Sequence, residues 1–156
     1  MAVKVTLPSD REVQVTRTLK APRTLVWDAH TKPELVKQWL TGPPGWSMPV
    51  CEIDLRVGGA YRYRWRNEAD GSEFGSSGFH REIVPLERIV TTERMEGFQG
   101  EAVNTLVLTE ANGVTTLVLT MDFGSKEARD GAVATGMTDG MEMSYQRLDA
   151  LAAAHA

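Results

Sequence analysis

The stretch GGAYRYRWRNEADGSEF, residues 58–74, alternates aromatic residues with arginines and then reaches an Asp-Gly pair. Successive side chains of a strand point to opposite faces, so Tyr61, Tyr63 and Trp65 share one face and the arginines share the other. The aromatic face favours burial, whereas the arginine face favours water. This pattern predicts a strand that covers an apolar core, followed by a hairpin turn.

Strand-like patterns continue on both sides of this stretch. The segment 12–19 alternates Val13, Val15 and Arg17 with polar residues and stops at Ala21-Pro22. Six further strands are expected at about 50–56, 59–67, 73–84, 87–95, 102–111 and 114–123. Turn residues separate them, including an Asn-Gly pair typical of hairpins, so the sheet is expected to be mostly antiparallel.

Three segments have helical periodicity instead. Segments 22–31 and 32–40 each place a proline where a first helical turn favours it. The segment 136–154 repeats apolar residues every three or four positions, namely Met137, Met141, Tyr145 (or Ser144), Leu148 and Leu151. The proline-rich segment 41–49 is expected to be a loop. An α+β fold follows, in which the long helix covers the sheet.

Length and composition limit the classes of protein. The 156 residues suit one domain, expected over residues 9–155, and the net charge of −4 argues against a nucleic-acid partner. The single cysteine cannot form an internal disulfide, and the first residues lack the apolar run of a secretion signal. No apolar run approaches the ~20 residues that cross a bilayer, so no membrane span is expected. A cytoplasmic location is the simplest expectation.

Together these segments resemble the activator of heat-shock-protein ATPase (AHSA) type of START-like, or SRPBCC, domain, in the Bet v 1-like superfamily. The resemblance runs from about Val13 to Ala153. Its marks, in chain order, are Ala21-Pro22, Trp39, Arg56, Gly58-Gly59, Gly78, Glu82, Pro85, Gly140-Met141 and Leu148.

The resemblance implies a helix-grip fold. In this fold a curved, seven-stranded antiparallel sheet wraps around a long C-terminal helix, and two short helices follow the first strand. In many relatives an apolar or aromatic small molecule occupies a cavity between sheet and helix. Tyr61, Tyr63 and Trp65 are then expected to face the helix.

Twelve residues are the expected ligand contacts: Trp39, Trp46, Tyr61, Tyr63, Trp65, Asn104, Leu106, Leu119, Met121, Met137, Met141 and Tyr145. The same residues are also those that a filled core would use, so their pattern alone leaves both readings open. Trp46 is expected either to close the cavity mouth as a lid or to anchor its loop.

Catalytic residues are harder to find. No nucleophile signature occurs, and Cys51 is expected to be an inert buried thiol. The three histidines lack metal-ligand spacing, so neither a metal nor a cofactor is expected. His80 and Glu82 are weak catalytic candidates, although Phe79 and Ile83 are expected to be the core-facing residues of their strand.

Glu82 is expected to pair with Arg56 or Arg62 as a structural ion pair. The arginine face, made of Arg62, Arg64 and Arg66 and extended by Arg81, Arg88 or Arg94 of neighbouring strands, could meet an acidic protein surface. A homodimer is also left open.

Three functions remain. The first is a stand-alone protein that binds an apolar or aromatic small molecule. The second, less expected than the first, is an enzyme of cyclase, dehydratase or hydrolase type that uses the same cavity. The third is a chaperone-associated interaction module. The sequence contains no second domain like that of co-chaperone relatives, which argues against chaperone activation.

Overall fold

The computed structural model describes residues 3–41, 43–98 and 100–155. Within them, one antiparallel sheet has eight strands in the order β1-β2-β8-β7-β6-β5-β4-β3. The strands are β1 (Lys4–Thr6), β2 (Glu12–Leu19), β3 (Trp46–Ile53), β4 (Ala60–Asn67), β5 (Glu73–Val84), β6 (Arg88–Met95), β7 (Ala102–Ala111) and β8 (Val114–Asp122). From β3 to β8 each strand pairs with the next in sequence, and β2 then pairs with β8.

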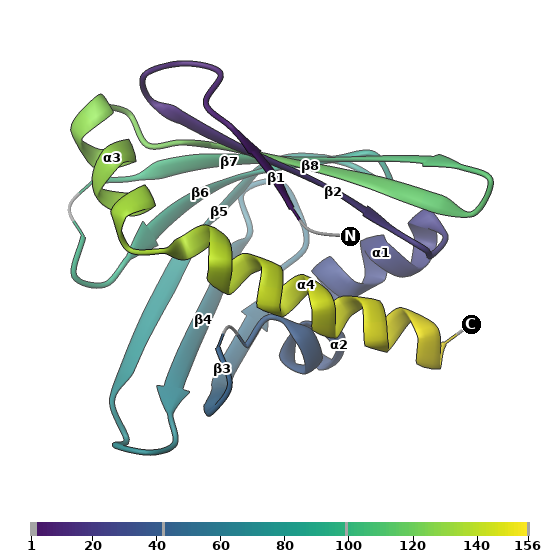
Figure 1. Cartoon of the computed structure of the whole chain (residues 1–156), viewed down its shortest axis with the longest axis horizontal. Coiled ribbons are helices and arrows are strands. Elements are labelled where there is room, and N and C mark those ends of the chain that lie inside the picture. Colours follow the sequence, from purple (N-terminus) through teal and green to yellow (C-terminus); the bar gives the residue numbers. More distant parts are fainter. Residues whose placement is uncertain (1–2, 42, 99, 156) are drawn as a thin grey trace.

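Helices cover one face of this sheet. They are α1 (Arg23–Thr31), α2 (Pro33–Trp39), α3 (Lys126–Ala134) and α4 (Met137–Ala154). Figure 1 shows α4 running across the concave side of the curved sheet, with α1 and α2 beside its C-terminal half. This is the predicted helix-grip arrangement. None of the described helices is both long enough and apolar enough to span a membrane.

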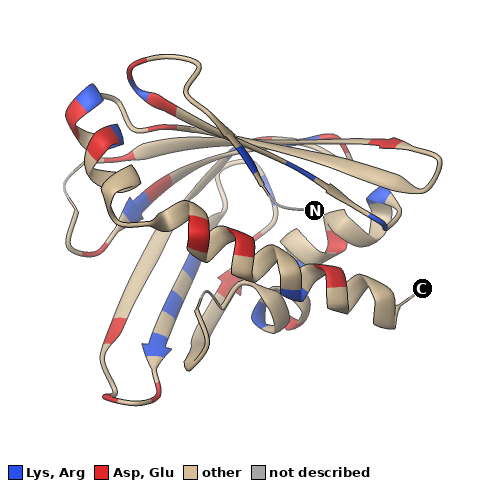
Figure 2. Cartoon of the chain, viewed as in Figure 1, with Lys and Arg blue, Asp and Glu red and all other residues tan. Residues whose placement is uncertain are grey.

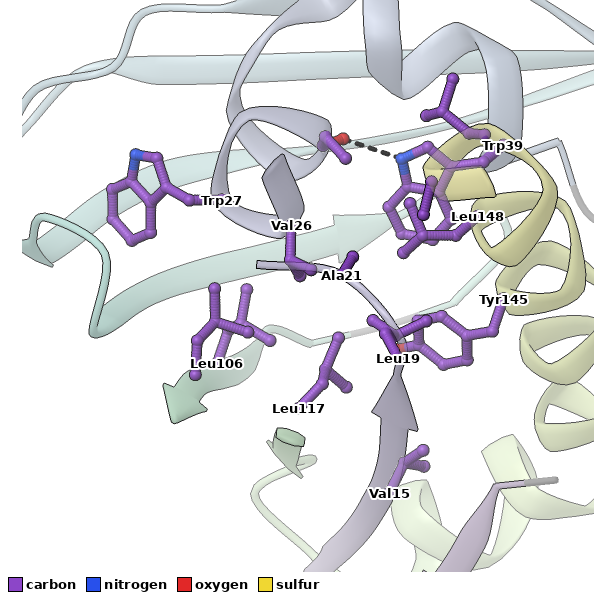
Figure 3. Packing of buried hydrophobic residues seen from close by; sticks show 14 of the residues in the cluster. Val15, Leu19, Ala21, Val26, Trp27, Trp39, Leu106, Leu117, Tyr145 and Leu148 are labelled. Carbon is purple, nitrogen blue, oxygen red and sulfur yellow. Dashed lines mark hydrogen bonds between the residues drawn. The ribbon is translucent and has the colours of Figure 1, made fainter. Parts of the chain in front are cut away.

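The main core lies where β2, β7 and β8 meet α1 and α4. The register places Val15 beside Leu119 and Leu119 beside Leu106, so alternate apolar side chains of three strands reach the same face. Figure 3 shows sheet residues such as Leu19 and Leu117 packed beside Tyr145 of α4. Burial of this face is what holds the helix against the sheet.

The opening stretch forms β4 as predicted. Tyr61 is buried, Tyr63 and Trp65 are half-buried, and the intervening Arg62 is exposed. The glycine of the facing strand makes room for this aromatic row. A Cβ atom at Gly78 would collide with the Thr92 carbonyl and lie 2.9 Å from a ring carbon of Tyr61.

Two local expectations were wrong, and one helix was not expected. The sheet has eight strands rather than seven, because the short β1 adds to the edge at β2. The segment 41–49 is not a loop throughout, since β3 begins at Trp46. Pro49 is compatible with that strand because β3 is the other edge of the sheet and carries a bulge between Ser47 and Val50. Helix α3, which Ser125 caps at the Ala128 amide, was not predicted.

Candidate functional site

A pocket of about 330 Å³ lies between the sheet and the helices. Ligand pockets usually range from about 300 to 1,000 Å³, so this one suits a small molecule. Its apolar and aromatic lining is Trp39, Leu40, Ile53, Leu55, Tyr61, Tyr63, Trp65, Ile89, Met95, Leu106, Leu119, Met121, Met137, Met141 and Tyr145. Its polar lining is His30, Thr31, His80, Thr91, Glu93, Asn104 and Ser144. All the residues expected to contact a ligand, except Trp46, are therefore brought together.

The sheet side of the pocket is a row of rings along β4. The ring centroids are 5.0 Å apart for Tyr61 and Tyr63, and 5.8 Å apart for Tyr63 and Trp65. Tyr61 donates a hydrogen bond from its hydroxyl to the Thr92 carbonyl at 2.7 Å, and Trp65 donates from Nε1 to the Leu40 carbonyl at 2.8 Å. These bonds satisfy the polar ends of the two rings and hold the wall in one arrangement.

The helix side is built from α2 and α4. Trp39 stacks on Tyr145 with the centroids 5.7 Å apart, and its Nε1 donates to the Ala29 carbonyl at 2.7 Å, as Figure 3 shows. Met137 and Met141 complete this side. Methionine is unbranched and flexible, so these two side chains can adapt to ligands of different shape.

A buried arginine fixes α4 over the pocket. Arg17 of β2 is 2% exposed and binds two carboxylates of α4 with paired hydrogen bonds of 2.9–3.0 Å, to Glu142 and to Asp149. Burial lowers the pKa of Arg17, but the bonds and charges of Asp149 and Glu142 outweigh it and raise that pKa overall. Hydrogen bonding to Arg17 lowers the pKa of Glu142.

One part of the sheet wall of the pocket is polar. The Glu93 carboxyl group accepts hydrogen bonds from the Ser76 hydroxyl at 2.9 Å and from the Asn104 side-chain amide at 3.2 Å. Among the described residues, Asn104 Oδ1 is the buried side-chain oxygen that has no hydrogen-bond partner. The pocket therefore presents acceptors beside its aromatic wall.

Two histidines also line the pocket. His30 places Nδ1 2.7 Å from the Val26 carbonyl, and His80 places Nδ1 3.0 Å from the Gly59 carbonyl. A carbonyl only accepts, so Nδ1 is the protonated nitrogen in each ring. Burial lowers the pKa of His30 to about 4, so this ring is neutral at pH 7.

The expected core face of β5 was wrong at its centre. His80 is buried and Phe79 is 56% exposed, while Ile83 packs against the core as expected. The register of β5 against β6 shifts between His80 and Glu82. This irregularity puts residues three positions apart on the same side, which strict alternation does not allow.

Trp46 and Glu82 lie away from the pocket. Trp46 packs edge-on against Phe74, with the centroids 5.5 Å apart, because its segment is a strand rather than a loop at the pocket mouth. Glu82 is exposed and pairs with Arg88 at 3.1 Å, not with Arg56 or Arg62. The two weak catalytic candidates, His80 and Glu82, thus have no shared site.

Cys51 is buried in a small cluster with Val36 and Met48. Burial raises the pKa of its thiol to about 11, so little of it is the reactive thiolate at neutral pH.

The arginines of β4 are engaged by acidic neighbours on the outer face. Arg62 lies 3.9 Å from Glu52, and Arg64 lies 2.7 Å from Glu96. Figure 2 shows the basic positions along β4. The outer face therefore carries mixed charge rather than an unopposed basic stripe.

Sequence reasoning missed Glu93, Thr91 and Ile89 as pocket residues, although they lie on one face of β6 with Met95. Their alternation was the available signal, and the charge of Glu93 concealed it. The ion pairs of Arg17 were also missed: alternation placed Arg17 on the face of Val13 and Val15, but its partners Glu142 and Asp149 lie on a helix far along the chain.

A known protein family matches most of the chain. The family model described as "Activator of Hsp90 ATPase homolog 1-like protein" matches residues 20–153. Among curated proteins, none matches the sequence significantly.

Solved structures with similar chains come from several bacteria. A crystal structure from Rhodobacter sphaeroides has a TM-score of 0.93 at 30% identity, and the match covers 99% of both chains. One from Chromobacterium violaceum has a TM-score of 0.81 at 29% identity, covering 92% of this chain and 98% of the other. One from Mycobacterium smegmatis has a TM-score of 0.85 at 23% identity, covering 100% and 99%, and indicates the shared fold.

Proposed function

This chain belongs to the Activator of Hsp90 ATPase homolog 1-like family, and we propose that it binds a small apolar or aromatic molecule. The fold of the family supports a ligand-binding or interaction module. The observation that carries the proposal is the pocket of about 330 Å³ between the sheet and α4. Its lining is mainly apolar with a few polar groups, which is the usual composition of a small-molecule site.

The fixed and adaptable parts of the lining support this function. The rings of Tyr61 and Trp65 are held by hydrogen bonds to backbone carbonyls, so they lose little freedom when a ligand packs on them. Met137 and Met141 lie across the pocket and can adjust to the ligand. A flat apolar molecule between these two sides would bury surface on both faces.

The contacts favour binding over the two other functions. Acid–base catalysis by His80 and Glu82 would need both groups near one substrate, but Glu82 lies outside the pocket. A chaperone-type interaction through the β4 arginines would need charges open to a partner, but Arg62 and Arg64 already pair with glutamates.

A blocked pocket tests the proposal. Leu119 of β8 lines the pocket, whereas the adjacent Val118 is on the other face of the strand. Fatty acids, flavonoids and aromatic polyketides would be screened by thermal shift and native mass spectrometry against the unaltered chain, Leu119→Trp and Val118→Trp.

We expect one ligand per chain and a raised melting temperature. A ligand at a hundred times its Kd stabilises the folded state by about 2.7 kcal/mol. Leu119→Trp should abolish the shift and Val118→Trp should keep it. The proposal fails if no compound binds, or if binding persists with Trp at position 119.

A further inference from the structure

Lysine and arginine are absent from the described pocket lining, which contains one carboxyl group. That carboxyl group belongs to Glu93. The other titratable side chains in the lining are His30, His80 and the tyrosines, and His30 is neutral at pH 7. A ligand head group beside Glu93 therefore meets an acidic carboxyl group without a lysine or arginine to balance it.

The side-chain amide of Asn104 has a defined orientation. A carboxylate only accepts hydrogen bonds, so the Asn104 nitrogen must be the atom that faces Glu93 Oε1 at 3.2 Å. The Asn104 oxygen is then left buried without a donor. Buried polar atoms almost always have a partner in the protein or in ordered water, so a buried acceptor beside a pocket can accept a hydrogen bond from a ligand donor.

Glu93 and Asn104 come from adjacent strands. Asn104 of β7 is the register partner of Thr91, which is two residues from Glu93 on the same face of β6. Glu93 also lies close to the aromatic row. Burial raises the pKa of Tyr61 and Tyr63, and the nearby negative charge of Glu93 raises both pKa values further. A cation here would face two oxygen acceptors, one on Glu93 and one on Asn104, beside the aromatic row.

Building on the proposed function, we propose that the ligand is an aromatic or apolar amine. Its protonated amino group donates hydrogen bonds to the Glu93 carboxylate and to Asn104 Oδ1, and its apolar part lies between the β4 rings and α4. An ammonium group supplies the donor that Asn104 lacks and balances the charge of Glu93. A ligand carboxylate would instead bring like charge to Glu93 and add no donor for Asn104.

The experiment compares four compounds that share one ring system: naphthylethylamine, naphthylethanol, ethylnaphthalene and naphthylacetate. Their affinities for the unaltered chain are measured by isothermal titration calorimetry. Hydrogen bonds to charged groups contribute about 1.5–3 kcal/mol, so the amine should bind at least about tenfold more tightly than the hydrocarbon. The alcohol should fall between them, and naphthylacetate should bind most weakly.

Two variants locate the effect. Glu93→Gln keeps the shape of the side chain but removes its charge, so it should reduce the amine's affinity about tenfold and leave that of ethylnaphthalene unchanged. Glu96→Gln is the control, because Glu96 is an exposed carboxylate three residues away that pairs with Arg64. It should change neither affinity.

The outcomes separate this inference from the proposed function. If ethylnaphthalene or naphthylacetate binds as tightly as the amine, the pocket binds small molecules but the amine assignment is wrong. If the amine preference survives Glu93→Gln, the assignment to Glu93 is wrong. If none of the four compounds binds, the amine assignment is wrong, and the proposed function is decided by the wider compound screen. The compound series needs no variant, so a folding defect in Glu93→Gln would not prevent the decision.

Discussion

At the scale of single residues, His30 shows how the pocket environment controls a titratable group. The ring lines the pocket, donates from Nδ1 to the Val26 carbonyl and meets Trp39 edge-on with centroids 4.8 Å apart. Burial disfavours its charged form and lowers its pKa from 6.5 to about 4. The folded protein therefore holds this histidine neutral over a pH range in which the unfolded chain protonates it.

This difference predicts a loss of stability in mild acid. As the pH falls from 6.5 to 4, the unfolded chain takes up a proton at His30 that the folded chain does not, so the free energy of unfolding decreases. At 1.36 kcal/mol per pKa unit, the contribution of His30 is roughly 3 kcal/mol. Chemical denaturation at several pH values in this range measures the free energy of unfolding. In His30→Gln the free energy of unfolding should fall less steeply, because the contribution of His30 is absent.

The matched control is His155→Gln. His155 also places Nδ1 near the carbonyl four residues earlier, but it is exposed at the end of α4. This variant should keep the pH dependence of the unaltered chain. Equal pH dependence in His30→Gln and the unaltered chain would contradict the neutral, buried state of His30.

Residue roles were predictable where alternation held. Tyr61, Tyr63 and Trp65 were correctly placed on the helix-facing side from sequence, because β4 is regular there. His80 and Phe79 were assigned to the wrong faces, because the shift in the register of β5 is not visible in residue types. The ligand-binding roles of Tyr61, Tyr63 and Trp65 remain proposals.

At the scale of elements, Arg17 connects β2 to α4. Its guanidinium group is almost fully buried, whereas the side chains of Glu142 and Asp149 are 18% and 41% exposed. The two acidic residues are seven positions apart, so they lie on one side of the helix two turns apart. Tyr145 lies between them, with the Arg17 guanidinium carbon 5.8 Å from its ring centroid.

The unequal burial predicts unequal effects of mutation. The double variant Glu142→Gln with Asp149→Asn leaves the buried Arg17 charge without a carboxylate, and should lower the free energy of unfolding by about 3–5 kcal/mol. Arg17→Met removes the buried charge and leaves carboxylates that can reach water, so it should cost only about 1–2 kcal/mol. Urea denaturation at pH 7 measures both. A larger loss for Arg17→Met would show that packing, rather than charge balance, sets the cost.

Element boundaries were predicted well wherever turn residues marked them. The Asn112-Gly113 turn has positive φ at both residues, 54° and 76°, as expected for a two-residue hairpin. The start of β3 was missed because Pro49 in the middle of a segment usually indicates a loop. Only the position of β3 at the sheet edge makes the missing N–H harmless.

At the scale of the whole molecule, the pocket follows from the way one helix covers a strongly curved sheet. Toward the β2–β8 side, Leu108, Leu117 and Leu148 are fully buried and fill the space. Toward β4, the distance is bridged by the aromatic row and the methionines, and the pocket of about 330 Å³ remains. The same chain thus has a filled core at one end and a hollow at the other.

The hollow predicts sensitivity to pressure. Unfolding under pressure is favoured by the loss of internal void volume, with typical changes of about −20 to −100 mL/mol. Leu119→Trp should fill part of the pocket and make the volume change of unfolding less negative, whereas Val118→Trp on the other face should not. High-pressure tryptophan fluorescence measures this volume. If Leu119→Trp leaves it unchanged, the hollow is not a void of the folded state.

The sequence by itself determined most of the strands, the long helix and the side of β4 that is buried, because these depend on periodicity and turn residues within short segments. The family followed from the resemblance of motifs spread along the chain, and the family model matches residues 20–153. Only the tertiary structure decided the ion pairs of Arg17, the inward turn of His80, and the meeting of Glu93 with Asn104. Each of these depends on the register between strands or on the distance from sheet to helix. Residues far apart in the chain set both quantities, so no local pattern records them.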